Sequence, residues 1–506
     1  MTHTRPAPPF AAAALLVAGL LVVFANTPAA NTAVPESTGG RLVAALLAET
    51  PLTDDLRSLT REIGGRPTGS DANLRAVEWG LERFREAGVD ARRESFEMPG
   101  LWLEKSSSVT IRGEKIHFAA AAAAMPFSTA APTPGVTAPL LDAGTGSAAD
   151  FVRLGALAKG AFLLVETVPL LDVPGLFREY NDAYAIEGRA VEANARGVVY
   201  MSSRPEGILY RHNSSLRGDD ARPMLVLERG AATRALDLLR LGSELSLTAV
   251  LDLEIGPSYE SYNVIGEIRG SSKPEEVVLI GAHLDSWDLG AGALDNGANV
   301  SLVIDIARQM QRLGIHPART VRFALWNGEE QGLVGSYRYT ETHEDELDDH
   351  IVAMSFDIGC GRISGFFTGG RPEILPTLER ALEPVAGLGP FQQVDIPVVG
   401  TDNFDFMMHG VANLIGNQES AAYGPNYHAQ SDRIDQCDLR TVRLNAAIVA
   451  AVTHGFANAD ISWGRQGRDE IEELIRSTDL EQQMRSFNVW GDWEAGRRGR
   501  RDRPGN

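Results

Sequence analysis

Apolar residues recur at helical spacing early in the chain, from Leu74 to Phe84. This pattern predicts an amphipathic helix, which Ser70 or Asp71 can cap and which Gly88 ends. The stretches ARRESFEM and SSVTIRG that follow have the pattern of strands.

The pattern changes near residue 120, where the chain becomes rich in Ala and Pro and poor in charge. Short apolar runs such as GAFLLVET, RGVVYMSS and PMLVLE then alternate with turns. We therefore expect residues 122–255 to form a separate, inserted β-rich unit. Because this unit carries no cluster of metal ligands or nucleophiles, we expect it to act as a lid or to steer substrate.

From residue 260 onward, apolar runs alternate with helical stretches such as ANVSLVIDIARQMQRLG. Such alternation predicts an α/β fold with a mostly parallel sheet that helices cover on both faces. The expected strands are Val264–Ile268, Val277–Ile280, Val321–Trp326, Ile351–Phe356 and Val411–Ile415. Residues 461–506 are polar and charged, which predicts a mobile C-terminal tail.

The first 29 residues have the features of a signal peptide. Arg5 precedes an apolar run from Phe10 to Phe24, and the small residues Thr27 and Ala29 follow it. The run is shorter than the roughly 20 residues of a membrane span. We expect export to the periplasm or beyond, with no stable span in the mature protein; an uncleaved N-terminal membrane anchor is the alternative.

Charge and cysteine content narrow the classes of partner. The 506 residues carry a formal net charge of −20, which argues against a nucleic-acid partner because phosphates would be repelled. Cys360 and Cys437 are the two cysteines. They can pair in an oxidising compartment or remain two small buried residues.

Ligand-type side chains follow the predicted strands of the second half. In a doubly wound sheet, sites form beyond the carboxyl ends of strands, so these side chains should share one rim. They are His283, Asp285, Asp295, Glu329, Glu330, Asp357 and His428. Each alone has a structural explanation, such as a capped turn or an exposed acidic pair. His409 is the alternative to His428, but it follows FDFMM in a predicted helix, which favours a structural role.

Mixed imidazole and carboxylate ligands suit zinc. Their number exceeds the needs of one tetrahedral ion, whereas two ions about 3.5–4 Å apart, sharing a carboxylate, would use them. Without metal, carboxylates so close together would repel each other and some would take up protons.

Four segments, AHLDSWDLGAGALDNG, WNGEEQGLVGS, SFDIG and YHAQSD, resemble the motifs of the dizinc exopeptidases, a family with secreted aminopeptidases and carboxypeptidase Q. The first segment is most similar to the carboxypeptidase Q branch. The segment IGGRPTGSDANLRAVEWGLERFREAGVD resembles that family's N-terminal part. The insert is more loosely similar to a protease-associated domain. The resemblance covers about residues 45–460.

The resemblance implies a peptidase domain of residues 34–121 and 256–460, with two Zn2+ ions per chain. His283 and Asp357 would complete one zinc site, Glu330 and His428 the other, and Asp295 would bridge them. Glu329 would be the general base, and Asp285 would orient His283. Asn296 departs from this branch, which often has a second Asp there. Because the ligands Asp357 and His428 would approach the same metal pair, Cys360 and Cys437 could be neighbours.

The expected function is that of an exported dizinc metallo-exopeptidase that acts on short peptides or dipeptides, with a homodimer possible. Two alternatives use the same fold. One is a non-catalytic receptor like the transferrin-receptor branch, although such proteins typically lose ligands or the base. The other is glutaminyl cyclase, which works with one zinc.

Overall fold

The structure is a computed structural model, and it describes residues 37–501 except positions 206 and 421. The predicted signal peptide lies outside the described residues. No helix in this described part is both long and apolar enough to cross a membrane.

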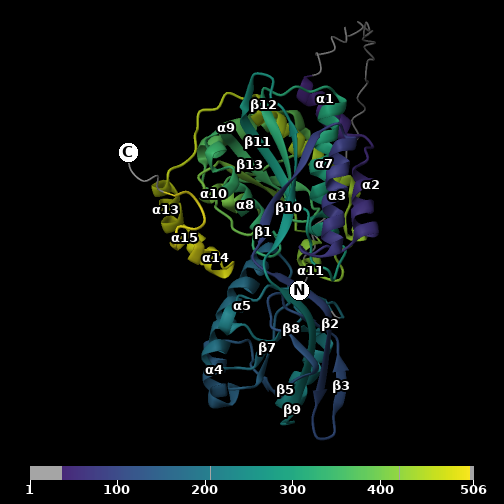
Figure 1. Cartoon of the computed structure of the whole chain (residues 1–506), viewed down its shortest axis with the longest axis vertical. Coiled ribbons are helices and arrows are strands. Elements are labelled where there is room, and N and C mark those ends of the chain that lie inside the picture. The colour runs from purple at the N-terminus through teal and green to yellow at the C-terminus, as the bar shows by residue number, and fades with distance from the viewer. Residues whose placement is uncertain (1–36, 206, 421, 502–506) are drawn as a thin grey trace, which may run out of the picture. The chain divides into compact units, whose positions relative to one another are not determined.

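The first of the two β-sheets in the described residues has seven strands (Figure 1). Its order is β1-β10-β12-β11-β13-β15-β14. The bounds are β1 Asp90–Met98, β10 Tyr259–Ile268, β11 Lys273–His283, β12 Arg319–Trp326, β13 His350–Ser355, β14 Ile363–Phe367 and β15 Asn413–Gln418. The four neighbouring strands β12, β11, β13 and β15 are parallel, and β1, β10 and β14 pair antiparallel at the edges. The predicted α/β fold is confirmed.

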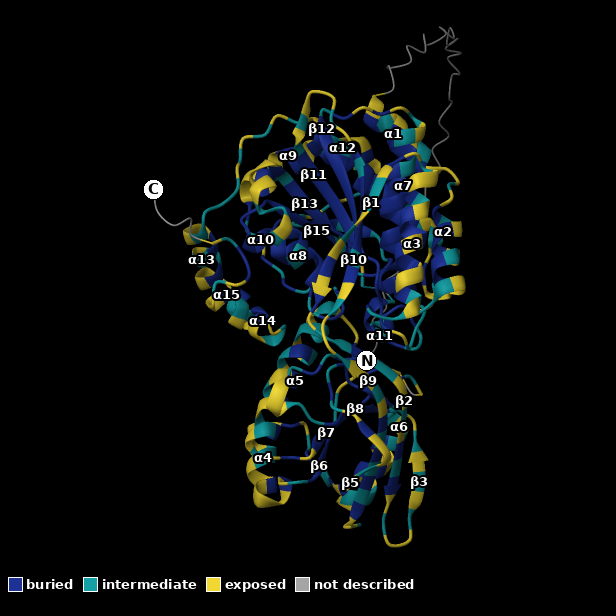
Figure 2. Ribbon diagram, viewed as in Figure 1, coloured by how far each residue is buried: buried dark blue, intermediate teal, exposed yellow. Residues whose placement is uncertain are grey.

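Helices cover both faces of this sheet, because alternate residues of a strand point to opposite sides. Val278 and Ile280 of β11 face one apolar core, whereas Val277 and Leu279 face another. The first core packs against α1 (Thr38–Leu47), α2 (Leu52–Ser58), α3 (Asp71–Glu86), α7 (Ala298–Arg312), α9 (Leu375–Leu382) and α12 (Leu439–Asn458). The second packs against α8 (Val334–Thr342) and α10 (Asn403–Met408). Figure 2 shows the central strands buried along their length, as a sheet covered on both faces requires.

Helix α3 has the predicted position. Its cap is Ser70, whose Oγ accepts a hydrogen bond of 3.1 Å from the backbone N–H of Asn73. Val77 and Phe84 lie in the core, but Leu74 is 46% exposed. The apolar stripe is therefore narrower than the sequence pattern indicated.

A second, eight-stranded sheet has the order β3-β2-β9-β5-β6-β7-β8-β4. The strands are β2 Leu101–Arg112, β3 His117–Ala120, β4 Ala122–Ala124, β5 Ala131–Asp142, β6 Phe162–Val165, β7 Gly197–Met201, β8 Met224–Leu227 and β9 Leu245–Gly256. Three helices accompany it, α4 (Ala148–Leu154), α5 (Val173–Glu192) and α6 (Arg229–Arg240).

This second sheet begins before the expected boundary at residue 122. Strand β2 pairs with β9 from Leu101 opposite Gly256 to Arg112 opposite Ser246. The chain therefore enters and leaves this sheet through two neighbouring strands, and β2 and β3, which precede residue 122, are both part of it. The division of the chain into two separately folding domains stays a prediction.

The C-terminal stretch, expected to be a mobile tail, forms helices α13 (Arg468–Ser477), α14 (Leu480–Ser486) and α15 (Trp490–Glu494). Their apolar residues pack against α10 and its neighbours in one core, which contains Leu333, Val399, Phe404, Met407, Met408, Ile471, Ile475, Leu480, Met484, Val489 and Trp493. A buried ion pair from Arg498 to Asp405, with N–O distances of 2.6 and 2.8 Å, fastens the end of the stretch. The apolar residues of these helices are few and lie among charged residues in the sequence, so the sequence pattern did not predict the helices.

Candidate metal centre

Four neighbouring parallel strands deliver the ligand-type residues to one place. Strand β11 ends at His283, and Asp295 follows in the loop before α7. Glu329 and Glu330 come after β12, and Asp357 comes after β13. His428 comes after β15 and the short helix α11 (Tyr423–Asn426).

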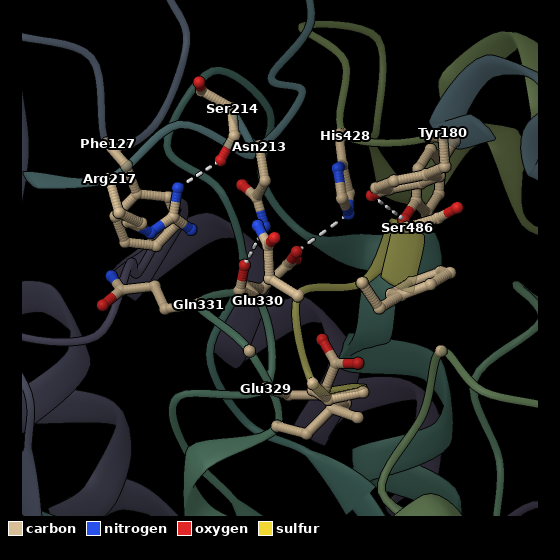
Figure 3. Close-up of a pocket in the computed structure, with 17 residues that line it drawn as sticks. Phe127, Tyr180, Asn213, Ser214, Arg217, Glu329, Glu330, Gln331, His428 and Ser486 are labelled. Carbon is tan, nitrogen blue, oxygen red and sulfur yellow. Dashed lines mark hydrogen bonds and ion pairs between the residues drawn. The ribbon is translucent and has the colours of Figure 1, made fainter. Parts of the chain in front are cut away.

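Asp295 lies between the two histidines. Its Oδ1 is 3.0 Å from Nε2 of His283, and its Oδ2 is 3.4 Å from Nε2 of His428. His283 Nε2 is also 2.9 Å from Oδ1 of Asp357. His428 Nε2 is 2.8 Å from Oε2 of Glu330, and Figure 3 shows these two side chains pointing toward each other. The arrangement has two halves that share Asp295.

Glu329 lies close to the first half. Its Oε2 is 4.0 Å from His283 Nε2, and ligand atoms of His283, Glu329 and Asp357 all lie within 4.8 Å of one another. The same limit holds for His283, Asp295 and Glu330. All the sequence-predicted residues except Asp285 therefore present side chains to one buried cluster.

These side chains fit a metal. Oδ2 of Asp295 and Oε1 of Glu330 are buried without a hydrogen-bond partner in the described part of the chain. A buried carboxylate oxygen without a partner is costly unless a cation compensates it. Burial raises the pKa of both Glu329 and Glu330, and neighbouring carboxylates add to the effect. Burial lowers the pKa of His428 to about 4, which keeps its ring neutral at pH 7, the form that binds metal.

Asp285 contacts His283 in an unexpected way. The His283 Nδ1 atom lies 3.0 Å from the backbone carbonyl oxygen of Asp285 and 3.7 Å from its carboxylate. The carboxylate Oδ2 instead accepts hydrogen bonds from Thr68 Oγ1 at 2.8 Å and from the backbone N–H of Gly328 at 3.1 Å. Asp285 thus links the end of β11 to the turn that carries Glu329.

Two further residues shape the loop that carries Asp295, and sequence reasoning gave them no role. The carboxylate of Asp432 accepts hydrogen bonds from three consecutive backbone N–H groups, at residues 293, 294 and 295. The buried Arg66 donates to the backbone oxygens of Leu284, Ala291 and Gly292. Both residues lie in segments that carry the family resemblance, IGGRPTGSD and YHAQSD, which is the signal that could have found them.

Glycine is required at one point of this loop. Gly292 has φ +61, and a Cβ there would lie 2.4 Å from Oγ of Ser286. The left-handed conformation and the close packing together let the chain fold back, so that Asp295 returns to the end of its own strand.

His428 depends on the inserted unit. Its φ is 56, a left-handed conformation that is uncommon for residues other than glycine. Arg211 holds it there: the backbone N–H of Arg211 donates to the His428 carbonyl at 3.0 Å, and His428 Nδ1 lies 3.3 Å from the Arg211 carbonyl. Tyr210 and Ala429 continue this contact as an antiparallel bridge. Residues of the predicted insert therefore contact the backbone of a candidate ligand directly.

His409 lies outside the cluster. Its Nδ1 is 2.7 Å from Oε2 of Glu344, and Arg465 also pairs with Glu344 at 2.7 Å. These contacts agree with the structural role that its sequence context favoured.

Cys360 and Cys437 form a disulfide, with Cα atoms 5.7 Å apart. It joins the loop after Asp357 to the segment after His428, so the two cysteines are neighbours as expected.

The cluster opens into a cavity of about 890 Å³. Asp295, Glu329, Asp357 and His428 are among the residues that line it. A smaller pocket on the side of Glu330 is lined by Asn213, Arg217 and Tyr180 among others (Figure 3). The larger volume lies within the range of about 300–1,000 Å³ that is usual for small-ligand sites.

Comparisons with known proteins agree with this geometry. Residues 263–453, which hold every ligand-type residue described above, match the model of Peptidase family M28. Carboxypeptidase Q of Xenopus laevis is 27% identical over 406 residues, which cover 79% of this chain and 84% of that protein. The probable lipoprotein aminopeptidase LpqL of Mycobacterium tuberculosis is 26% identical over 427 residues, with coverage of 76% and 80%.

Solved structures show the same fold. The crystal structure of a Peptidase M28 precursor from Shewanella amazonensis matches with a TM-score of 0.76 at 25% identity, covering 85% of this chain and 98% of that chain. A zinc aminopeptidase from Bacillus subtilis matches in fold with a TM-score of 0.63 at 22% identity, covering 79% and 93%.

Proposed function

We propose that this chain, whose residues 263–453 match the model of Peptidase family M28, is a zinc metallopeptidase of that family. It would be an exported, carboxypeptidase Q-like exopeptidase with two Zn2+ ions that hydrolyses short peptides or dipeptides. The observation that carries the proposal is the position of Asp295 between His283 and His428, at 3.0 and 3.4 Å. A carboxylate placed in this way suits a bridge between two ions.

The assignment of ligands follows from the same distances. His283 and Asp357 would hold one ion, His428 and Glu330 the other, and Asp295 both. Glu329 is the remaining carboxylate, and it lies farther from His283 than Asp295 and Asp357 do. We therefore assign it to proton transfer. Arg66 and Asp432 would keep the Asp295 loop in place.

Bound zinc ions would polarise the scissile carbonyl and lower the pKa of a water molecule. Glu329 would accept the proton of the attacking water and donate it to the nitrogen of the leaving amine. The breaking of the C–N bond then yields a carboxylic acid and an amine.

Substrate size is limited by the cavity of about 890 Å³ that leads to the cluster. A cavity of this volume is typical of sites for small ligands, which supports short peptides as substrates.

The test is a metal count per chain beside a panel of free, N-blocked and C-amidated dipeptides, with products identified by mass spectrometry. Two zinc ions and metal-dependent hydrolysis of dipeptides are expected. Metal-loaded protein that cleaves none of them would favour the receptor alternative. One zinc with cyclisation of N-terminal glutamine would favour glutaminyl cyclase.

Export is part of the proposal, and the Cys360–Cys437 disulfide supports it because such bonds persist in oxidising compartments. N-terminal sequencing of the exported protein should begin near Ala30. A membrane-bound product that retains Met1 would instead favour the anchor.

A further inference from the structure

We propose that Phe487, from the C-terminal segment 478–487, and the apolar residues at the start of α5 form an apolar wall that selects short peptides with an apolar side chain beside the scissile bond, with Phe487 as the specificity-determining residue. The inference rests on the proposed peptidase function and adds the class of side chain that the site accepts. The C-terminal segment lies beyond residue 453, where the match to the family model ends.

Apolar side chains that no core uses gather around the large cavity. Val173, Leu176 and Phe177 of α5 are half-buried, line the cavity, and belong to none of the apolar cores of the described residues. Ile396 lines the same cavity and is 47% exposed. Several apolar side chains left open around one concave surface indicate a binding site for an apolar group.

Phe487, which belongs to the C-terminal segment, lines the same cavity. Its ring stacks on that of Tyr180, with centroids 4.7 Å apart and planes at 19°, and its centroid is 6.3 Å from that of Phe177. Because Phe487 lines both the large cavity and the small pocket beside Glu330, its ring lies at the boundary between them.

The segment is fixed in place on both sides. Ser486 Oγ donates to Oδ1 of Asn181 on α5, and the backbone N–H of Val399 donates to Oε1 of Gln483 at 3.0 Å. Leu480 and Met484 are fully buried in the core under α10. A wall with such anchors is rigid enough to discriminate between side chains.

The wall and the metal ligands lie on one cavity. The hydroxyl groups of Tyr180 and Tyr427 are 3.0 Å apart, and the ring of Tyr427 stacks on His428 with centroids 3.7 Å apart. A peptide held at the ligands would therefore place a neighbouring side chain against Phe487. No Lys or Arg is among the described residues that line this cavity, so an acidic side chain would find no charged partner there.

The test compares wild type with Phe487→Ala on two dipeptide series, X–Gly and Gly–X, where X is Gly, Ala, Leu or Phe. The wild type should favour Leu or Phe over Gly in one series by roughly 10–100-fold in kcat/KM, the range for apolar pockets. Phe487→Ala should reduce this ratio about tenfold, mainly through a higher KM for the apolar substrates. Its metal content should equal that of wild type.

Trp490→Ala is the matched control. Trp490 is a half-buried aromatic residue of the same segment, but it lines neither cavity. It should leave the substrate ratio unchanged. Leu176→Ala tests the α5 part of the wall should Phe487→Ala fail to fold, and it should also lower the ratio.

An active wild type without preference between Gly and Leu would overturn the inference but not the peptidase function. An equal loss of the ratio in Phe487→Ala and Trp490→Ala would also overturn it, because the segment would then act only through stability. A metal-loaded wild type that cleaves no peptide would overturn the peptidase function, and the wall with it.

Discussion

The imidazole of His283 is held by the main chain of Asp285 and not by its carboxylate, since Nδ1 lies 3.0 Å from the carbonyl oxygen and 3.7 Å from Oδ1. The carboxylate serves the neighbouring turn instead, through Thr68 and the N–H of Gly328. Asp285 therefore supports His283 through its main-chain carbonyl and the turn after β12 through its carboxylate.

The two groups can be separated by mutation. Asp285→Asn keeps the carbonyl oxygen and an acceptor for Thr68 and Gly328, so metal content and turnover should both stay close to wild type. Asp285→Ala removes that acceptor, and metal affinity should fall by about 10–100-fold, the usual effect of losing an outer partner of a metal site. Metal titration beside kinetics on both variants measures this. Equal losses in the two variants would mean that the negative charge of Asp285 matters more than its hydrogen bonds.

Mutations of the adjacent residues Glu329 and Glu330 should affect zinc content and turnover differently. Glu330 Oε2 is 2.8 Å from His428, so Glu330→Gln should lose or weaken one zinc together with activity. Glu329→Gln should keep both zinc ions but lose turnover by about 10²–10⁴-fold, because it lacks the proton carrier.

Metal analysis beside kinetics on these two variants decides the assignment. A zinc-replete and fully active Glu329→Gln would end the proposed mechanism. Loss of zinc from Glu329→Gln would make Glu329 a ligand, which its position within 4.8 Å of His283 and Asp357 ligand atoms also allows.

The strands and the cluster could be predicted from sequence because both follow from local order. Each parallel strand is a continuous apolar run, and its ligand-type residues follow directly, so topology brings His283 and Asp357 to one rim. The contacts that depend on distant segments could not be predicted in this way. Nothing near His428 indicates that Arg211 of the insert holds its backbone, since this pairing joins residues 217 positions apart.

Two differences between the sequence pattern and the observed elements have the same origin. The sequence pattern assigns strand β2 to the segment before the insert. Its pairing with β9, which lies far along the chain, places it in the second sheet. The C-terminal helices read as a solvated tail because their apolar residues are few, and their burial depends on Phe404 and Met408 of α10.

Arg211 should link the insert to the stability of the metal centre. Its buried guanidinium pairs with Glu104 and, at 2.8 Å, with Asp288. Arg211→Met leaves the nearly buried Glu104 without its partner, which should cost about 3–5 kcal/mol of unfolding free energy. It should also lower zinc occupancy through the His428 backbone. The exposed Arg240, which pairs with Asp142 and Glu166, is the control, and Arg240→Gln should cost at most about 1 kcal/mol. Chemical denaturation and metal analysis measure both effects; similar small changes in the two variants would contradict the link.

Glu187 on α5 should make stability depend on pH. Its buried carboxylate accepts hydrogen bonds from Ser214 and Ser215, but Oε1 has no partner among the described residues. Burial raises its pKa to about 7, whereas an unfolded glutamate titrates near ~4.3. Between these two values the folded state binds more protons than the unfolded state, so the free energy of unfolding falls as pH rises. The loss of unfolding free energy caused by ionised Glu187 is absent below about pH 4.3 and complete above about pH 7. Its size is on the order of 3 kcal/mol.

Glu187→Gln removes this titration and keeps a hydrogen-bond acceptor for the two serines. Its unfolding midpoint should match that of wild type near pH 4.5 and exceed it at pH 8. Glu192→Gln is the matched control because Glu192 is exposed on the same helix, and its difference from wild type should not change with pH. Thermal unfolding of the three proteins from pH 4.5 to 8, under equal metal conditions, gives the comparison. A Glu187→Gln difference that stays constant over this range would show that the carboxyl group does not titrate there.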